Sequence, residues 1–253
     1  MSVTHATPHA HRDPEGSRIG MWLFLLTEIL LFAGCFLAYA VFRARYAGDF
    51  HFAAQELNLA LGLVNTLVLL TSSLTMVLAI AALERGRDRA AGAWTACTIA
   101  LGAAFLVVKG FEWAAKIHHG IYPNSPSLAD SHTPGEQVFY GLYYMLTGLH
   151  ALHVVIGLIV LAVMVVLIAR APRKTVVVEG VAADGVALTG PGGEVLWGHP
   201  AERGASRVEV SFVVPGDTGE REARAGRLEN AGLYWHLVDV IWIFLFPLFY
   251  LIS

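Results

Sequence analysis

Long uncharged runs of hydrophobic residues alternate with short polar connections along most of this chain. An α-helix needs roughly 20 residues to cross the hydrocarbon core of a bilayer, which is about 30 Å thick. Five segments meet or nearly meet that length, at residues 19–42, 58–83, 90–117, 137–169 and 232–252. The pattern predicts an all-α protein, a polytopic membrane bundle of five transmembrane helices.

One stretch departs from this pattern, at residues 172–228. Hydrophobic and polar residues alternate at 175–179 and 208–212, with turn-forming Gly, Pro and Asp residues between the two runs. We therefore predict a small β-rich extramembrane insertion on the cytoplasmic side, acting as a spacer or subunit contact. The expected organisation is a polar tail (1–17), helices one to four (18–171), the insertion (172–228) and the fifth helix (229–253), with one membrane domain overall.

Composition narrows the class of protein. Of 253 residues, 56% are hydrophobic and 15% charged, whereas globular proteins usually have about 25% charged residues. A purely soluble protein is therefore excluded. The net charge of −3 provides no basic surface for nucleic acid. Two cysteines, Cys35 and Cys97, are too few for a disulfide scaffold, a zinc ribbon or a cysteine-held iron–sulfur cluster.

The distribution of Lys and Arg predicts the orientation. These residues concentrate in the N-terminal tail, at 85–89 and at 170–227. If the chain crosses the membrane five times, these three segments all lie on the same side. The opposite side has Arg43, Arg45 and Lys116. Cytoplasmic loops are richer in Lys and Arg. We therefore expect a cytoplasmic N-terminus and a periplasmic or external C-terminus. The first eighteen residues are polar and do not form the apolar core of a signal peptide.

Several titratable residues interrupt the hydrophobic segments. On insertion scales a charged side chain at the membrane centre costs about 2.5–3.5 kcal/mol, so each one requires a partner or a function. Glu28 and His153 lie near the middle of their helices and could share one depth. The candidate residues are Glu28, Glu112, His150, His153, His236 and Asp239.

Imidazole and carboxylate groups in a bundle can bind a metal or haem. The spacing here favours another interpretation, because His150 and His153 lack the Glu-x-x-His pattern. We predict no metal site and no catalytic residue. Glu28 is the candidate for an influence on proton uptake. Buried polar pairing or lipid contact is predicted for the other five, Glu112, His150, His153, His236 and Asp239. In the second segment Asn58, Asn65 and Ser72 recur every seven residues, which favours a packing face over a pore lining.

Five motifs together resemble a known family. In chain order they are GMWLFLLTEILLF (20–32), LVNTLVLL (63–70), GFEW (110–113), TGLHALHVVIG (147–157) and AGLYWHLVDVIW (231–242). They are similar to the signatures of subunit III of haem–copper cytochrome c oxidases, in its five-helix form. In that family Glu28 matches the buried carboxylate of the first shared helix.

The resemblance implies a cofactor-free accessory subunit of a proton-pumping oxidase that reduces dioxygen with electrons from cytochrome c. Haem would lie in subunit I and copper in subunit II, the two expected partners. This chain would stabilise the catalytic subunit, bind phospholipid and support proton uptake. Its residues agree, since it has too few membrane histidines for two haems and a copper and no Cys-x-x-x-Cys for a dinuclear copper centre.

Other assignments stay open at this point. The third subunit of a quinol oxidase and a nitric-oxide-reductase-associated paralogue share these motifs. A different class is a free-standing membrane transporter or metalloenzyme that uses the buried histidines and carboxylates. Against a transporter, the chain has no evident inverted repeat or pair of broken helices.

Overall fold

The computed structural model describes the backbone of residues 14–170, 173–180, 188–189, 195–196, 208–215 and 218–252. Side chains are described for residues 16–170 and 222–252. The predicted polar tail lies almost entirely outside the described residues. The chain divides into two compact units, residues 1–170 with 222–253 and residues 171–221. Each unit is treated by itself below.

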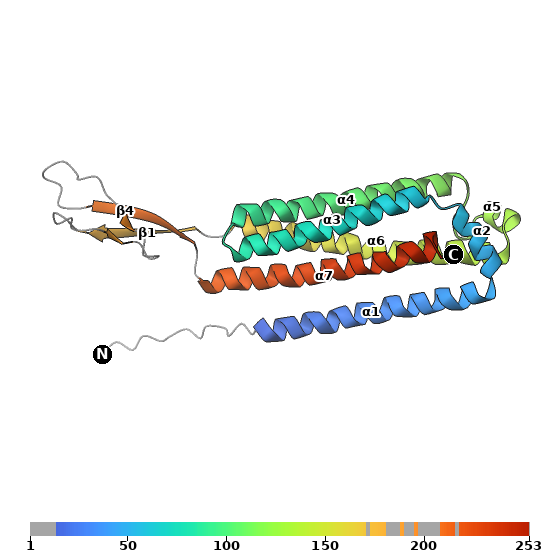
Figure 1. The fold of residues 1–253 in the computed structure, drawn as a ribbon, viewed down its shortest axis with the longest axis horizontal. Coiled ribbons are helices and arrows are strands. Elements are labelled where there is room, and N and C mark those ends of the chain that lie inside the picture. The colour runs from blue at the N-terminus through green and yellow to red at the C-terminus, as the bar shows by residue number, and fades with distance from the viewer. Residues whose placement is uncertain are drawn as a thin grey trace. The chain divides into compact units, whose positions relative to one another are not determined.

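The first unit is built from helices (Figure 1). Its elements are α1 (Pro14–Arg45), α2 (Ala47–Gln55), α3 (Leu59–Glu84), α4 (Asp88–His118), α5 (Pro126–Ser131), α6 (Pro134–Ala169) and most of α7 (Thr218–Tyr250). In the described part of the chain, five helices, α1, α3, α4, α6 and α7, are long and apolar enough to cross a membrane. They alternate in direction along the chain (Figure 1). The predicted all-α bundle with five membrane helices is confirmed.

Helix α7 begins at Thr218, well before the predicted start of the fifth segment. Its first turns are polar, so a search for uncharged runs does not detect them, although Ala, Arg and Glu are good helix formers. These turns are also packed, because Leu228 is buried and Arg224 approaches Asp88 of α4 with 3.8 Å between Nη1 and Oδ2.

Local signals in the sequence explain the helix ends. The Asn58 side chain caps α3 by accepting from the Leu61 N–H, and Thr133 and Glu136 form a reciprocal capping box at the start of α6. Gly86 and Gly120 lie two residues after the last residues of α3 and α4, and both have φ of +73°. Glycine adopts this left-handed conformation without a steric penalty.

Trp235 of α7 joins the centre of the bundle. Its ring is packed between Gly102 of α4 and Gly157 of α6, and a Cβ added at either glycine would lie 2.5 or 2.9 Å from a ring carbon. Its indole Nε1 donates to the Ser72 hydroxyl of α3 at 3.0 Å. One side chain therefore contacts three other helices. Asn65 and Ser72 are both fully buried on this side of α3, whereas Asn58, the third residue of the predicted packing face, is exposed at the start of the helix.

Helix α1 contributes a narrow inward face. Leu25, Phe32 and Tyr39 are buried along one line of the helix, and the Tyr39 hydroxyl donates to the Leu248 carbonyl of α7 at 2.7 Å. Most of the remaining apolar side chains of α1 are exposed. In Figure 1, α1 lies at the edge of the group formed by α3, α4, α6 and α7.

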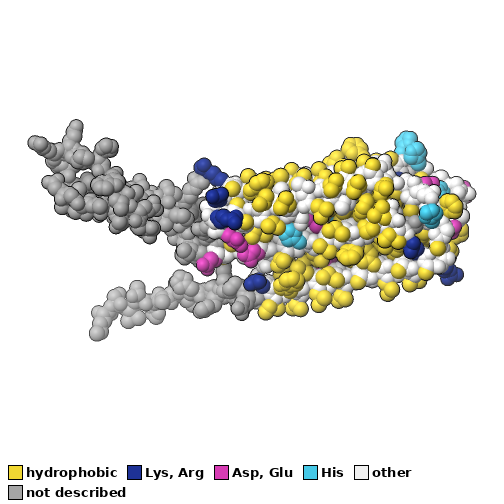
Figure 2. Space-filling model, viewed as in Figure 1, with side chains coloured by type: hydrophobic (Ala, Val, Ile, Leu, Met, Phe, Trp, Pro, Cys, Tyr) yellow, Lys and Arg dark blue, Asp and Glu magenta, His cyan; other side chains and the backbone are white. Residues whose placement is uncertain are grey.

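Large hydrophobic side chains are exposed on all five long helices. On the face shown in Figure 2 they cover the middle of the helical unit, while Lys, Arg, Asp and Glu gather mainly towards its two ends. This is the surface that a bilayer requires, with apolar groups at the hydrocarbon and charged groups at the water interfaces. The chain is a multi-pass membrane protein.

The second unit contains short antiparallel strands. Strand β1 (Arg173–Gly180) pairs with β4 (Val208–Pro215) in the register Val177 to Ser211. Strand β2 (Leu188–Thr189) pairs with β3 (Val195–Leu196). The two alternating runs at 175–179 and 208–212 are thus both strands, and each strand is longer than its run. The extramembrane, cytoplasmic location of this unit stays a prediction.

Candidate functional site

Two of the predicted residues meet where α1 packs on α6. The Glu28 Oε2 of α1 lies 2.8 Å from Nε2 of His153 of α6, and the two side chains are 15% and 10% exposed. The ring of Phe32 packs edge-on against the imidazole, and the Tyr234 hydroxyl donates to the His153 carbonyl at 3.0 Å. Glu28 and His153 therefore form one polar pair, held by residues from three helices.

Hydrogen-bond geometry sets the number of protons in this pair. The Nδ1 of His153 lies 2.7 Å from the Leu149 carbonyl oxygen. A carbonyl oxygen can only accept, so Nδ1 carries a hydrogen. The contact between Glu28 and Nε2 then requires one further hydrogen between the two atoms. The two side chains therefore share one hydrogen bond, whichever of the two atoms carries that hydrogen.

Lys109 and Glu112 of α4 form a second polar group, deeper in the protein. Nζ of Lys109 lies 2.9 Å from Oε2 of Glu112, and the side chains are 3% and 4% exposed. The other two ammonium hydrogens point to the hydroxyls of Tyr143 of α6, at 3.0 Å, and Tyr250 of α7, at 2.8 Å. Both hydroxyls donate to Oε1 of Glu112, at 2.9 and 2.6 Å. Three helices are thus joined by a hydrogen-bonded ion pair.

A third polar group lies near α2. Nζ of Lys116 donates to the Glu56 carbonyl at 3.2 Å, and the Tyr140 hydroxyl donates to the Glu56 carboxylate. Lys116 and Tyr140 are buried. Together with Lys109 and Glu112, these residues place charged groups along the interior from α2 towards the centre of the bundle.

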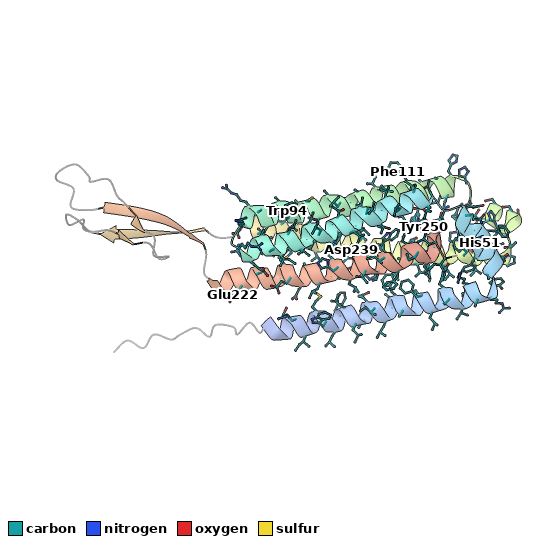
Figure 3. The ribbon with its side chains drawn as sticks, in the orientation of Figure 1. His51, Trp94, Phe111, Glu222, Asp239 and Tyr250 are labelled. Atoms are coloured by element: carbon teal, nitrogen blue, oxygen red, sulfur yellow. The ribbon has the colours of Figure 1, made fainter. Side chains whose placement is uncertain are left out.

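His236 and Asp239 lie on α7, facing α3, and Figure 3 labels Asp239. Oγ of Ser73 and Nδ1 of His236 are 2.6 Å apart. Asp239 is 3% exposed, and neither of its carboxylate oxygens has a hydrogen-bond partner among the described residues, although the Ser73 hydroxyl is a polar neighbour. The structure does not pair these two residues with each other.

His150 is fully buried, and its neighbours are aromatic. Its ring centroid lies 5.4 Å from that of Phe105 and 5.2 Å from that of Trp242. In the described part of the chain neither ring nitrogen has a hydrogen-bond partner. His150 therefore has different contacts from His153, although the two are only three residues apart.

Metal binding requires several donors around one point. In residues 16–170 and 222–252 no group of three or more His, Cys, Asp or Glu side chains is arranged to hold a metal ion. The histidines of α6 and α7 have other neighbours, namely Glu28 for His153, Ser73 for His236 and two aromatic rings for His150.

A lateral groove of about 270 Å³ lies close to the Glu28 pair. Its wall is mostly apolar and comes from α1, α6 and α7, while Arg227 and Asn230 contribute polar atoms. Asn230 Nδ2 also donates to the Ser17 hydroxyl of α1 at 3.1 Å. The lining residues are Met21, Phe24, Ile156, Val160, Arg227, Asn230, Ala231 and Tyr234.

Comparison with known proteins identifies the family to which this chain belongs. The family model described as cytochrome c oxidase subunit III matches residues 1–172, more than half of the chain. The chain belongs to the cytochrome c oxidase subunit III family. The matched range includes the helices that carry the Glu28–His153 pair and the Lys109–Glu112 group.

Individual members of the subunit III family align over nearly the whole chain. Cytochrome c oxidase subunit 3 of Thermostichus vulcanus is 28% identical over 98% of this chain and 93% of its own length. The subunit of the same name from Alkalihalophilus pseudofirmus is 31% identical over 93% of this chain and 86% of its own. The cytochrome bo(3) ubiquinol oxidase subunit 3 of Pseudomonas aeruginosa is 29% identical over 99% of this chain and 92% of its own.

Three tyrosines in the interior of this subunit III protein were not predicted from the sequence. Tyr143 and Tyr250 hold the Lys109–Glu112 ion pair, and Tyr140 binds Glu56, but none of the three is among the candidate residues predicted from the sequence. A signal was present, because polar or hydroxyl residues recur every three or four positions on one face of α6. These residues are Tyr140, Tyr143, Thr147 and His150, and all are buried.

Proposed function

We propose that this chain is a non-catalytic accessory subunit of a haem–copper oxidase, the third subunit of a complex that reduces dioxygen to water and pumps protons. Membership of the subunit III family carries this proposal. In it, subunit I holds the haem and subunit II holds copper, and this chain binds neither. Its contribution is to stabilise the catalytic subunit and to sustain proton uptake.

The interior of the bundle supports an accessory role. A redox centre would need free histidines around one point, whereas His153 and His236 are hydrogen-bonded to Glu28 and Ser73. The packing around Trp235 joins four helices into one body. Such a body provides a firm surface for a neighbouring subunit.

Within this function, Glu28 and His153 form the pair that we assign to proton uptake. The pair holds one exchangeable proton and is partly exposed at the edge of the bundle. A carboxyl group and an imidazole in hydrogen-bond contact offer both an acceptor and a donor for proton transfer. That property suits a residue pair near a proton path.

We also assign a phospholipid to the groove between α1, α6 and α7. Apolar walls suit an acyl chain, and Arg227 and Asn230 suit a phosphate headgroup. The excess of Lys and Arg on the side of the N-terminal tail favours a cytoplasmic N-terminus in the bacterial inner membrane. On this assignment the headgroup lies in the cytoplasmic leaflet.

The test is purification of the tagged chain from its own membranes in a mild detergent. We expect stoichiometric haem-bearing and copper-bearing subunits, the absorption spectrum of a haem–copper oxidase, and dioxygen consumption. After the chain is stripped from the complex, the haem should remain with the partner subunits. A chain that is purified alone, or that retains haem after stripping, would contradict the accessory role.

A quinol oxidase is the second candidate, because the relative from Pseudomonas aeruginosa carries that name. The same preparation separates the two. Dioxygen consumption with reduced cytochrome c but not with ubiquinol assigns a cytochrome c oxidase, and the reverse result assigns a quinol oxidase.

A further inference from the structure

Two polar side chains at the centre of the bundle have no hydrogen-bond partner among the described residues. They are Asn65 of α3, with both amide atoms unpaired, and His150 of α6, with both ring nitrogens unpaired. Each residue is 0% exposed. The two residues come from helices that are distant in the sequence. A local feature of one helix therefore cannot explain why both side chains lack a partner.

The two residues belong to helices that both contact Trp242 of α7. The His150 ring centroid is 5.2 Å from that of Trp242. Asn65 precedes Thr66, whose hydroxyl accepts from the Trp242 indole at 3.0 Å, and follows Gly62, which packs on Tyr250. Asn65 therefore occupies the turn of α3 that spans the levels of Trp242 and Tyr250.

The nearby polar groups are already engaged. All three ammonium hydrogens of Lys109 are used by Glu112 and two tyrosines. The Ser72 hydroxyl donates to Leu69 and accepts from Trp235. A shift of these groups towards Asn65 or His150 would break one hydrogen bond for each bond it formed.

Leaving such groups dry is costly. A buried donor or acceptor without a partner costs about 1–3 kcal/mol, and four such atoms are involved at these two residues. Native proteins satisfy such groups with ordered water at a frequency of about one buried molecule per 27 residues.

We propose that the layer around Trp242 is an internal hydration site, in which ordered water binds the Asn65 amide and the imidazole of His150. Water suits this position because each molecule both donates and accepts. A neutral imidazole offers one donor and one acceptor, and an amide offers both as well. Full burial excludes an acyl chain, and the donor set excludes a metal ion, since three ligands are not grouped there. The site is independent of the proposed function.

Such water changes the connectivity of the interior. His150 lies one helical turn from His153, and Lys109 lies 5.1 Å from the Trp242 ring. Water bound to His150 would add hydrogen-bonding groups at a level where the neighbours of His150 are the rings of Phe105 and Trp242.

X-ray hydroxyl-radical footprinting of the intact complex in lipid discs tests the site, because radicals formed from a bound water modify buried neighbours. Phe105 and Phe139 make a matched pair, since both are 0% exposed phenylalanines. Phe105 contacts His150 and Trp242, whereas Phe139 contacts the rings of Phe50, Tyr140 and Phe249. We expect a severalfold faster modification of Phe105 than of Phe139. Equal rates would overturn the proposal.

A variant gives a second readout. Asn65→Leu replaces the amide with an apolar side chain of similar size. We expect modification of Phe105 in the assembled variant to fall towards the rate of Phe139. Unchanged modification would remove Asn65 from the site. Should the variant not assemble, the comparison of the two phenylalanines in the wild-type complex still decides.

Discussion

Replacing Glu112 with Gln should destabilise the contact among α4, α6 and the last turn of α7. The carboxylate of Glu112 pairs with the Lys109 ammonium and accepts from the Tyr143 and Tyr250 hydroxyls. Gln retains the shape and one acceptor but removes the charge. With Lys109 only 3% exposed, its ammonium would remain buried without compensation, which costs about 3–5 kcal/mol in buried ion pairs.

A cost of that size is readily measured. It corresponds to more than about a hundredfold change in the equilibrium between native and locally opened subunit. The assay is retention of this subunit on the purified oxidase across a series of temperatures, quantified by mass spectrometry after removal of released chains. The Glu112→Gln subunit should dissociate or aggregate at clearly lower temperature than the wild type.

The double variant Lys109→Met with Glu112→Gln is the control. It removes both charges, and replacing both members of a buried pair with groups of similar volume is often neutral or stabilising. Its retention should return close to that of the wild type. The reasoning is refuted if Glu112→Gln behaves like the wild type, or if the double variant is no better than the single one.

Two other substitutions test the bundle and the proton pair. Gly102→Ala places a Cβ 2.5 Å from the Trp235 ring and should destabilise the subunit by about 1–3 kcal/mol. Gly92→Ala on the same helix meets only an ordinary 3.9 Å contact and should be tolerated, so equal thermal retention of the two variants would contradict this packing. Glu28→Gln still donates a hydrogen bond to His153 but holds no exchangeable proton. Haem spectra should stay intact while turnover or its durability falls, and unaltered oxygen consumption over long turnover would count against the role of Glu28.

The helical part of the fold was predictable because the bilayer imposes a simple requirement. Uncharged runs long enough to cross hydrocarbon are visible in the sequence, and all five became helices. The early start of α7 at Thr218 was not visible. Polar helical turns carry no hydropathy signal, and those of α7 are stabilised by contacts with α4 that only the fold creates.

For the candidate site, the depth of each residue in the membrane could be predicted from the sequence, but its hydrogen-bond partner could not. Position along the helices indicated that Glu28 and His153 share a level, and the two side chains meet. The roles of Tyr143 and Tyr250 required knowledge of helix rotation, because both residues suit a membrane interface equally well. His150 shows the same limit, since its position along α6 does not reveal that its ring packs against Phe105 and Trp242.

The position of Trp235 also has a consequence for biosynthesis. The slot between Gly102 and Gly157 belongs to α4 and α6, whereas the side chain that fills it belongs to α7, which is synthesised after both. Until then α3, α4 and α6 surround an unfilled centre, with the Ser72 hydroxyl lacking its indole donor. The packed centre that joins these four helices therefore forms only after α7 has been synthesised and inserted, so a chain that stops before α7 lacks it.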